Sequence, residues 1–179
     1  MFARHGYQAV SMRDIAQEVG VQQSAIYNHF SSKQTLLVDL MVHHMERTLS
    51  GLTEALIGID DPAHRLEAFT RHHILAHFDY LDDVFLAYME LRSLEEPGRT
   101  RVINLRKDYE RILKDILLSG TKLARFRVAD PDMMMRAILA MLSGVSVWFK
   151  EAGRMSRSEV AEAYVQASLQ MVGLAYETA

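Results

Sequence analysis

Side chains that commonly contact DNA gather near the start of the chain, in the stretch VGVQQSAIYNHF at residues 19–30. The amides of Gln and Asn can pair bidentately with adenine, and Ser and Ala are small enough to let a helix approach the bases. Hydroxyl, imidazole and ammonium groups can meet phosphates. A helix needed only for packing would be expected to carry Glu, Lys and Ala on its solvent-exposed side. We therefore predict DNA contacts from Ser11, Gln22, Gln23, Ser24, Ala25, Tyr27, Asn28, His29 and Lys33.

Within this set the predicted roles differ by side-chain chemistry. Gln23 and Asn28 are expected to read bases, because their amides offer a donor and an acceptor together. The residues expected to position the DNA backbone are Ser11, Tyr27, His29 and Lys33.

Two short helices are predicted to carry these side chains. Ser11 is a typical N-cap with Asp14 at the capping-box position, and the helix that it begins ends at Gly20. A second helix is expected over about residues 23–30. Two short helices joined by a tight glycine-containing turn are typical of the helix-turn-helix motif, although helical bundles without DNA contacts also use such turns. The residues expected to form its small core are Val19, Val21 and Ile26.

Helical signals fill the rest of the chain, and strand patterns are nearly absent. A long helix is expected from about Lys33, and Pro97 stops a later one. Asp130, followed by proline, should begin an apolar helix that reaches about Glu151. Ser156 begins a capping box whose helix should run to the C-terminus. The predicted fold is all-α, with about nine helices.

Composition limits the classes of protein to which the chain could belong. It has no cysteine, which excludes disulfides and thiolate metal sites and favours a reducing, cytoplasmic setting. The longest apolar run, residues 137–149, is too short to span a bilayer, and no signal peptide is apparent, so no membrane association is predicted. The net charge of −3 means that DNA contacts must come from individually placed groups rather than from a basic tail.

Residues 5–40, HGYQAVSMRDIAQEVGVQQSAIYNHFSSKQTLLVDL, resemble the TetR family of transcriptional regulators. The features that carry the resemblance are Gly6-Tyr7, the Ser11 cap, Ile15-Ala16, Gly20-Val21, Tyr27 with Phe30, and Lys33. The family often begins its recognition helix with Ser-Lys or Ser-Arg, where this chain has Gln22-Gln23. That difference removes a cap and a positive charge, so a lower affinity or a different operator is expected.

The resemblance implies two domains with different functions. Residues 1–40 would form a three-helix DNA-binding domain with a truncated first helix, and residues 41–179 a ligand-binding and dimerisation domain. The protein would be a homodimeric repressor on a palindromic double-stranded DNA operator, released by a small hydrophobic or acyl-CoA-type effector. Two recognition helices must meet successive major grooves, which also favours a dimer.

The two last predicted helices are unusually apolar, and a helix that is apolar nearly all round is buried on more than one side. A symmetric partner accounts for the second side, and the resemblance implies a four-helix interface. A fully enclosed core helix in a monomer is the alternative. The predicted interface residues are Ile138, Met141, Leu142, Val145, Val160, Tyr164, Ala167 and Met171.

Residues 99–127 carry nine basic and three acidic side chains, close to aromatic and methionine-rich segments. A basic face beside an apolar helix could hold the phosphates of an amphiphilic anion. The C-terminal part is similar to regulators of fatty-acid and sterol catabolism, which implies an acyl-CoA effector. A solvated cationic face is the competing interpretation. The candidate ligand residues are Phe78, Phe85, Tyr88, Arg92, Arg106, Tyr109 and Trp148.

No pattern predicts catalysis, a cofactor or a metal. His73 and His77 lie one helical turn apart, but zinc needs a third protein ligand that neither Glu67 nor Asp79 obviously supplies. No catalytic triad order, paired carboxylates or phosphate loop is present, so an enzyme is not expected. The alternative function is a helical ligand carrier or sensor domain without DNA binding.

Overall fold

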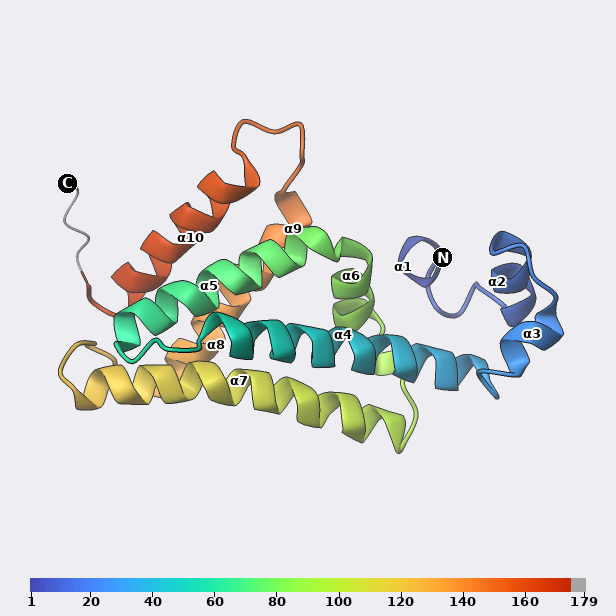
Figure 1. Cartoon of the computed structure of the whole chain (residues 1–179), viewed down its shortest axis with the longest axis horizontal. Helices are drawn as coiled ribbons and strands as arrows, with labels where there is room; N and C mark the ends of the chain where they lie inside the picture. The colour runs from blue at the N-terminus through green and yellow to red at the C-terminus, as the bar shows by residue number, and fades with distance from the viewer. Residues whose placement is uncertain (175–179) are drawn as a thin grey trace. The chain divides into compact units, whose positions relative to one another are not determined.

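The computed structural model describes residues 1–174, and these residues confirm the predicted all-α fold (Figure 1). None of the helices in this range is both long enough and apolar enough to cross a membrane. The chain divides into two compact units. The N-terminal unit consists of Met1–Arg47 and Tyr80–Arg106, and the C-terminal unit of Thr48–Asp79 and Lys107–Ala179. The first unit therefore includes a segment far from residues 1–40 in the sequence.

The N-terminal unit is built around three short helices that pack on parts of later ones. Its elements are α1 (Phe2–His5), α2 (Met12–Glu18), α3 (Gln23–Tyr27), the larger first part of α4 (Lys33–Ala55), α6 (Leu81–Met89), the 3-10 helix η1 (Leu91–Ser93) and the start of α7 (Gly98–Lys122). Ile26 and Leu37 share one hydrophobic core with Leu86, Leu94 and Val102. Segments 1–42 and 86–102 thus stabilise each other by burying a common apolar surface.

The C-terminal unit is organised around α5 (Pro62–Asp79) and α10 (Arg157–Met171), which lie side by side (Figure 1). Both helices also contact α8 (Pro131–Ser143), and α5 contacts α9 (Val145–Trp148). The last part of α4 and most of α7 complete this unit. Leu66, Phe69 and Ile138 are fully buried in its core, and a buried hydrogen bond runs from Thr70 Oγ1 to Ser168 Oγ at 3.2 Å.

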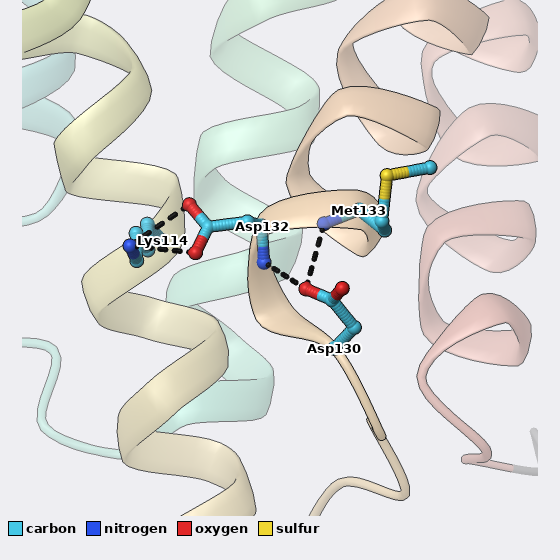
Figure 2. A network of polar contacts seen from close by, with 4 residues as sticks. All are labelled: Lys114, Asp130, Asp132 and Met133. Carbon is cyan, nitrogen blue, oxygen red and sulfur yellow. Dashed lines mark hydrogen bonds and ion pairs between the residues drawn. The ribbon is translucent and has the colours of Figure 1, made fainter.

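The helix starts predicted from capping residues are confirmed. Ser11 and Ser156 each form a complete capping box with the carboxylate three residues later. Asp130 caps α8, and its carboxylate accepts from the backbone N–H groups of Asp132 and Met133 (Figure 2). The Asp132 side chain in turn pairs with Lys114 of α7 at 2.8 Å, which ties the first turn of α8 to α7 (Figure 2).

Several predicted helix ends are wrong. The helix that Pro97 should stop ends at Met89 and is followed by η1, and α3 ends at Tyr27 rather than near Phe30. The apolar helix expected to reach Glu151 ends at Ser143, and the short α9 follows it after Gly144, a residue that stabilises helices poorly. The last helix ends at Met171 rather than continuing, because Gly173 adopts a positive φ of 83° that a helix does not contain. The final residues of the predicted helix, 175–179, lie outside the described part of the chain.

Candidate nucleic-acid interface and effector unit

Helices α2 and α3 form the predicted pair joined by a tight turn. Gly20 has a φ of 72°, and the backbone N–H of Val21 donates to the carbonyl of Ala16 at 3.0 Å, so the chain reverses within four residues. Ile26 anchors α3 with only 8% of its surface exposed, beside the buried Ala16 of α2. A single apolar anchor on a five-residue helix leaves most of that helix outside the core.

The predicted turn core is wrong in two of its three residues. Val19 and Val21 are 60% and 45% exposed, whereas Ile26 is buried as expected. Neither valine belongs to the common hydrophobic core of the unit. Ile26 shares that core with Met12, Ala16 and Leu37.

The predicted base-reading face of α3 is open to solvent. Gln22, Gln23, Ser24, Asn28 and His29 are all exposed. Gln22 occupies the N-cap position, but its side chain makes no capping hydrogen bond and so is not committed to the helix end. Ala25 is half-buried, and Tyr27 keeps 46% of its surface exposed. The amide side chains of this segment are therefore exposed, while Ile26 alone holds the helix in the core.

Ser11 is exposed but already bonded. Its hydroxyl accepts from the backbone N–H of Asp14 at 3.2 Å and donates to the Asp14 carboxylate at 2.7 Å. The hydrogen bonds from the Ser11 side chain and backbone hold the pKa of Asp14 below its ordinary value. The capping box fixes the position of the Ser11 hydroxyl at the start of α2, where the sequence predicts a contact with the DNA backbone.

Lys33 occupies a place that the sequence pattern did not indicate. Its ammonium donates to the backbone carbonyls of Tyr7 and Val10, at 3.0 Å each, and lies 4.2 Å from the centroid of the Tyr7 ring. The lysine therefore fixes the loop that leads into α2. A phosphate contact from Lys33 stays a prediction, and in DNA-bound protein it would compete with these two carbonyls.

The candidate ligand residues are divided between the two units. Phe85, Tyr88, Arg92 and Arg106 belong to the N-terminal unit, in which the Arg106 guanidinium lies 5.2 Å from the centroid of the exposed Tyr88 ring. Phe78, Tyr109 and Trp148 belong to the C-terminal unit.

Within the C-terminal unit the three aromatic candidates have different environments. Phe78 and Tyr109 are buried, while Trp148 is half-exposed and donates from Nε1 to the Tyr164 hydroxyl at 3.1 Å. Phe78 packs against Phe149 with the ring centroids 4.0 Å apart. Aromatic packing therefore accounts for Phe78 without a ligand.

A row of buried polar side chains on α5 was not predicted. Thr70, His73 and His77 follow one another on the inner face of this helix. The Nδ1 atom of His73 lies 2.9 Å from the Tyr109 hydroxyl, and the two imidazole rings stack with their centroids 4.0 Å apart. Within residues 1–174 no three potential metal-ligating side chains gather around one point. The hydrogen bonds of Thr70 with Ser168 and of His73 with Tyr109 offset the cost of burying these polar groups.

Much of the predicted basic face is paired with carboxylates. Arg111 binds Asp108 at 2.8 Å, and Lys114 binds Asp132 at the same distance. The other two pairs of this segment are Arg101 with Glu46 and Arg125 with Asp61. These partners compensate charge along residues 99–127, so fewer cations are available for a phosphate than the sequence count indicates.

The predicted interface residues fall into two groups. Four of them, Ile138, Leu142, Val145 and Val160, are at most 1% exposed within a single chain, so their side chains are not available to a second copy. The four that are only half-buried are Met141, Tyr164, Ala167 and Met171. The apolar character of α8 and α10 is thus explained in part by packing inside the C-terminal unit, as the monomer alternative expected.

Comparisons with known proteins agree with this organisation. The model of TetR-family bacterial regulatory proteins matches residues 1–40, and the model of tetracyclin repressor-like C-terminal domains matches residues 60–172. The HTH-type transcriptional repressor KstR2 of Mycobacterium tuberculosis strain H37Rv is 25% identical over 175 residues, covering 92% of this chain and 84% of KstR2.

Two solved structures share the fold over nearly the whole chain. PfmR, a TetR-family transcriptional regulator from Thermus thermophilus, is 31% identical with a TM-score of 0.85, and the match covers 94% of this chain and 92% of PfmR. AibR in complex with isovaleryl coenzyme A and operator DNA is 24% identical with a TM-score of 0.86, covering 93% and 90%. The chain belongs to the TetR family, a family of transcriptional regulators and not of enzymes.

Proposed function

We propose that this protein is a transcriptional repressor that binds a palindromic operator through α3 and leaves it when a small effector binds. The observation that carries the proposal is the outward face of α3, where Gln23 and Asn28 are exposed while Ile26 anchors the helix. Amides on a short helix held in this way can enter a major groove and pair with adenine. Family membership supports the same function.

The proposed operator-binding form is a homodimer. Two α3 helices can read both halves of a palindrome only if their separation matches one helical turn of DNA, about 34–36 Å. The half-buried Met141, Tyr164, Ala167 and Met171 are the residues of the original interface hypothesis that a second copy can still reach. The wild-type protein should sediment as a dimer and the Ala167→Arg variant as a monomer. A variant that still sediments as a dimer would exclude Ala167 from the interface.

The proposed effector is a small hydrophobic or acyl-CoA-type molecule that binds the C-terminal unit. The polar side chains buried in this unit, His73 and Tyr109 among them, support this proposal, because ligand pockets combine apolar walls with a few placed polar groups. AibR, which shares the fold, was crystallised with isovaleryl coenzyme A and operator DNA. Release requires that the effector bind the DNA-incompetent state more tightly than the competent one.

The DNA-binding proposal is tested by enrichment of duplexes from a random-sequence pool with wild-type protein, followed by gel shifts. Gln23→Ala should weaken binding by about 1–3 kcal/mol and relax the preference at one base position. Gln170→Ala, an exposed amide on α10, is the matched control and should change neither. Failure of the wild-type protein to enrich any sequence would contradict the proposal.

The effector proposal is tested on the same duplex with isovaleryl-CoA and palmitoyl-CoA, using free coenzyme A as the control. An acyl-CoA should release the protein from DNA at concentrations where coenzyme A does not. A ligand carrier without a DNA role, the alternative function, would bind the acyl-CoA but no duplex. A promoter fused to the enriched duplex should be silenced by the protein. Activation of that promoter would show an activator and contradict the proposed repression.

A further inference from the structure

The loop between α1 and α2, residues 6–10, is held by side chains from two distant parts of the N-terminal unit. The backbone N–H of Tyr7 donates to Glu90 Oε1 at 3.0 Å, across 83 positions of sequence. On the other side of the same residue, the Tyr7 carbonyl accepts from Lys33, which also holds the carbonyl of Val10. Both polar groups of the Tyr7 backbone are therefore bonded to charged side chains.

Glu90 is itself held in place. Its Oε2 atom accepts from the Ser93 hydroxyl at 2.6 Å, and the Ser93 carbonyl accepts from the Gln34 amide at 2.6 Å. The Gln34 side chain also accepts from the backbone N–H of Glu95 at 3.2 Å. A chain of hydrogen bonds thus links the start of α4, the end of α6 with η1, and the loop before α2.

The charge of Glu90 is stabilised by these partners. Partial burial by itself would raise the pKa of the Glu90 carboxyl, but the hydrogen bonds from Ser93 and from the Tyr7 amide, with the nearby Arg92 and Lys33, hold the pKa below its ordinary value. Hydrogen bonds to a charged acceptor are stronger than those between neutral groups. The carboxylate is therefore a firm anchor for the Tyr7 amide at neutral pH.

The anchored loop determines where α2 begins. Val10 directly precedes Ser11, whose hydroxyl is fixed by the capping box, and α2 braces α3 through the shared core. A shift of this loop would move the start of α2 relative to α4. Since DNA-binding groups must be placed within a fraction of an ångström, such a shift would lower affinity without unfolding the unit.

We propose that Glu90, which lies outside the helix-turn-helix, is a positioning residue for DNA binding that acts through the Tyr7 amide. This inference rests on the proposed DNA-binding function. Glu90 touches no DNA in this proposal, and its carboxylate fixes the loop that presents Ser11 and α2. A glutamine at this position keeps an acceptor oxygen but forms a weaker hydrogen bond than the charged carboxylate, so it should preserve most of the effect.

The test compares Glu90→Ala, Glu90→Gln and Glu90→Asp on the duplex enriched by the wild-type protein. Glu90→Ala removes the acceptor and should weaken binding about tenfold at 25 °C. Glu90→Gln keeps an acceptor oxygen and should restore affinity to within about threefold. Glu90→Asp keeps the charge but withdraws the carboxylate by one carbon, and should bind worse than Glu90→Gln. Glu95→Ala removes an exposed carboxylate that follows η1, keeps the backbone N–H that donates to Gln34, and is the matched control.

Hydrogen exchange supplies a second measurement that global stability does not determine. Under native conditions the Tyr7 amide should exchange faster in Glu90→Ala and keep its protection in Glu90→Gln, while amides of α10 stay unchanged. If Glu90→Ala does not fold, the DNA affinities of the other two variants are compared. Glu90→Asp should bind more weakly than Glu90→Gln, and the reverse order overturns the proposal. Wild-type affinity in Glu90→Ala, or an equal loss of affinity in Glu95→Ala, overturns the role of Glu90 and leaves the proposed function standing. Failure of the wild-type protein to bind any duplex overturns the proposed function as well.

Discussion

Replacing Lys33 with methionine separates a positioning role for this lysine from a phosphate contact. Methionine keeps a long unbranched stem but removes the ammonium, which donates to the carbonyls of Tyr7 and Val10 and lies over the Tyr7 ring. A hydrogen bond from a charged group contributes about 1.5–3 kcal/mol, and a cation–π contact about 0.5–1 kcal/mol. Because Lys33 is half-exposed and water can reach these groups, we expect a total loss of about 2–3 kcal/mol in the free energy of unfolding.

This loss should appear as a lower melting temperature. For a chain of this size each kcal/mol corresponds to about 2–4 °C, so Lys33→Met should melt about 5–10 °C below the wild-type protein by circular dichroism. Lys150→Met removes an exposed lysine in the loop after α9 and should melt within about 2 °C of the wild-type protein.

The salt dependence of DNA binding then identifies the role. A phosphate contact made by Lys33 would lower the slope of log K against log salt by about 0.9 when it is removed, and would leave the melting temperature unchanged. A positioning lysine should instead lower the affinity at every salt concentration with the slope preserved. A reduced slope together with wild-type thermal stability would refute the reasoning from the structure and restore the prediction from the sequence.

Three further predictions concern stability. Burial lowers the pKa of His44 from 6.5 to about 4, with Arg47 and Arg106 acting in the same direction and Asp83 opposing the shift. Between these two pH values the unfolded chain therefore binds a proton that the folded chain does not. Up to about 3 kcal/mol of stability, fully present above pH 6.5, should be lost as the pH falls toward 4. Urea midpoints at pH 7.5 and 5 measure this loss, which should be smaller in His44→Gln. Ile26→Ala should cost about 2–4 kcal/mol in urea unfolding and abolish DNA binding, and full DNA binding would contradict the anchor role. Gly120→Ala would place a Cβ atom against the Phe126 ring and should lower stability by about 1–3 kcal/mol, whereas a neutral change would show that the ring moves freely.

Local sequence determined the helices and their starts. The capping boxes at Ser11 and Ser156 and the Asp130 cap are visible in the sequence because all of their partners lie within three residues. The exposed face of α3 follows from its polar spacing in the same way. The end of α8 was missed because the apolar pattern continues across Gly144, where α8 ends and the short α9 follows.

Tertiary structure decided which residues support those local elements. Nothing near Tyr7 in the sequence indicates that Glu90 would hold its amide, and nothing near Lys33 indicates that two carbonyls would occupy its ammonium. In the same way, the burial of Ile138 and Val160 depends on how α8 and α10 pack in three dimensions and not on their apolar composition. A helix pattern depends on neighbours three or four positions away, so one sequence suffices to predict it. A contact across 83 positions depends on how the whole chain closes around its core, and only the folded molecule contains that information.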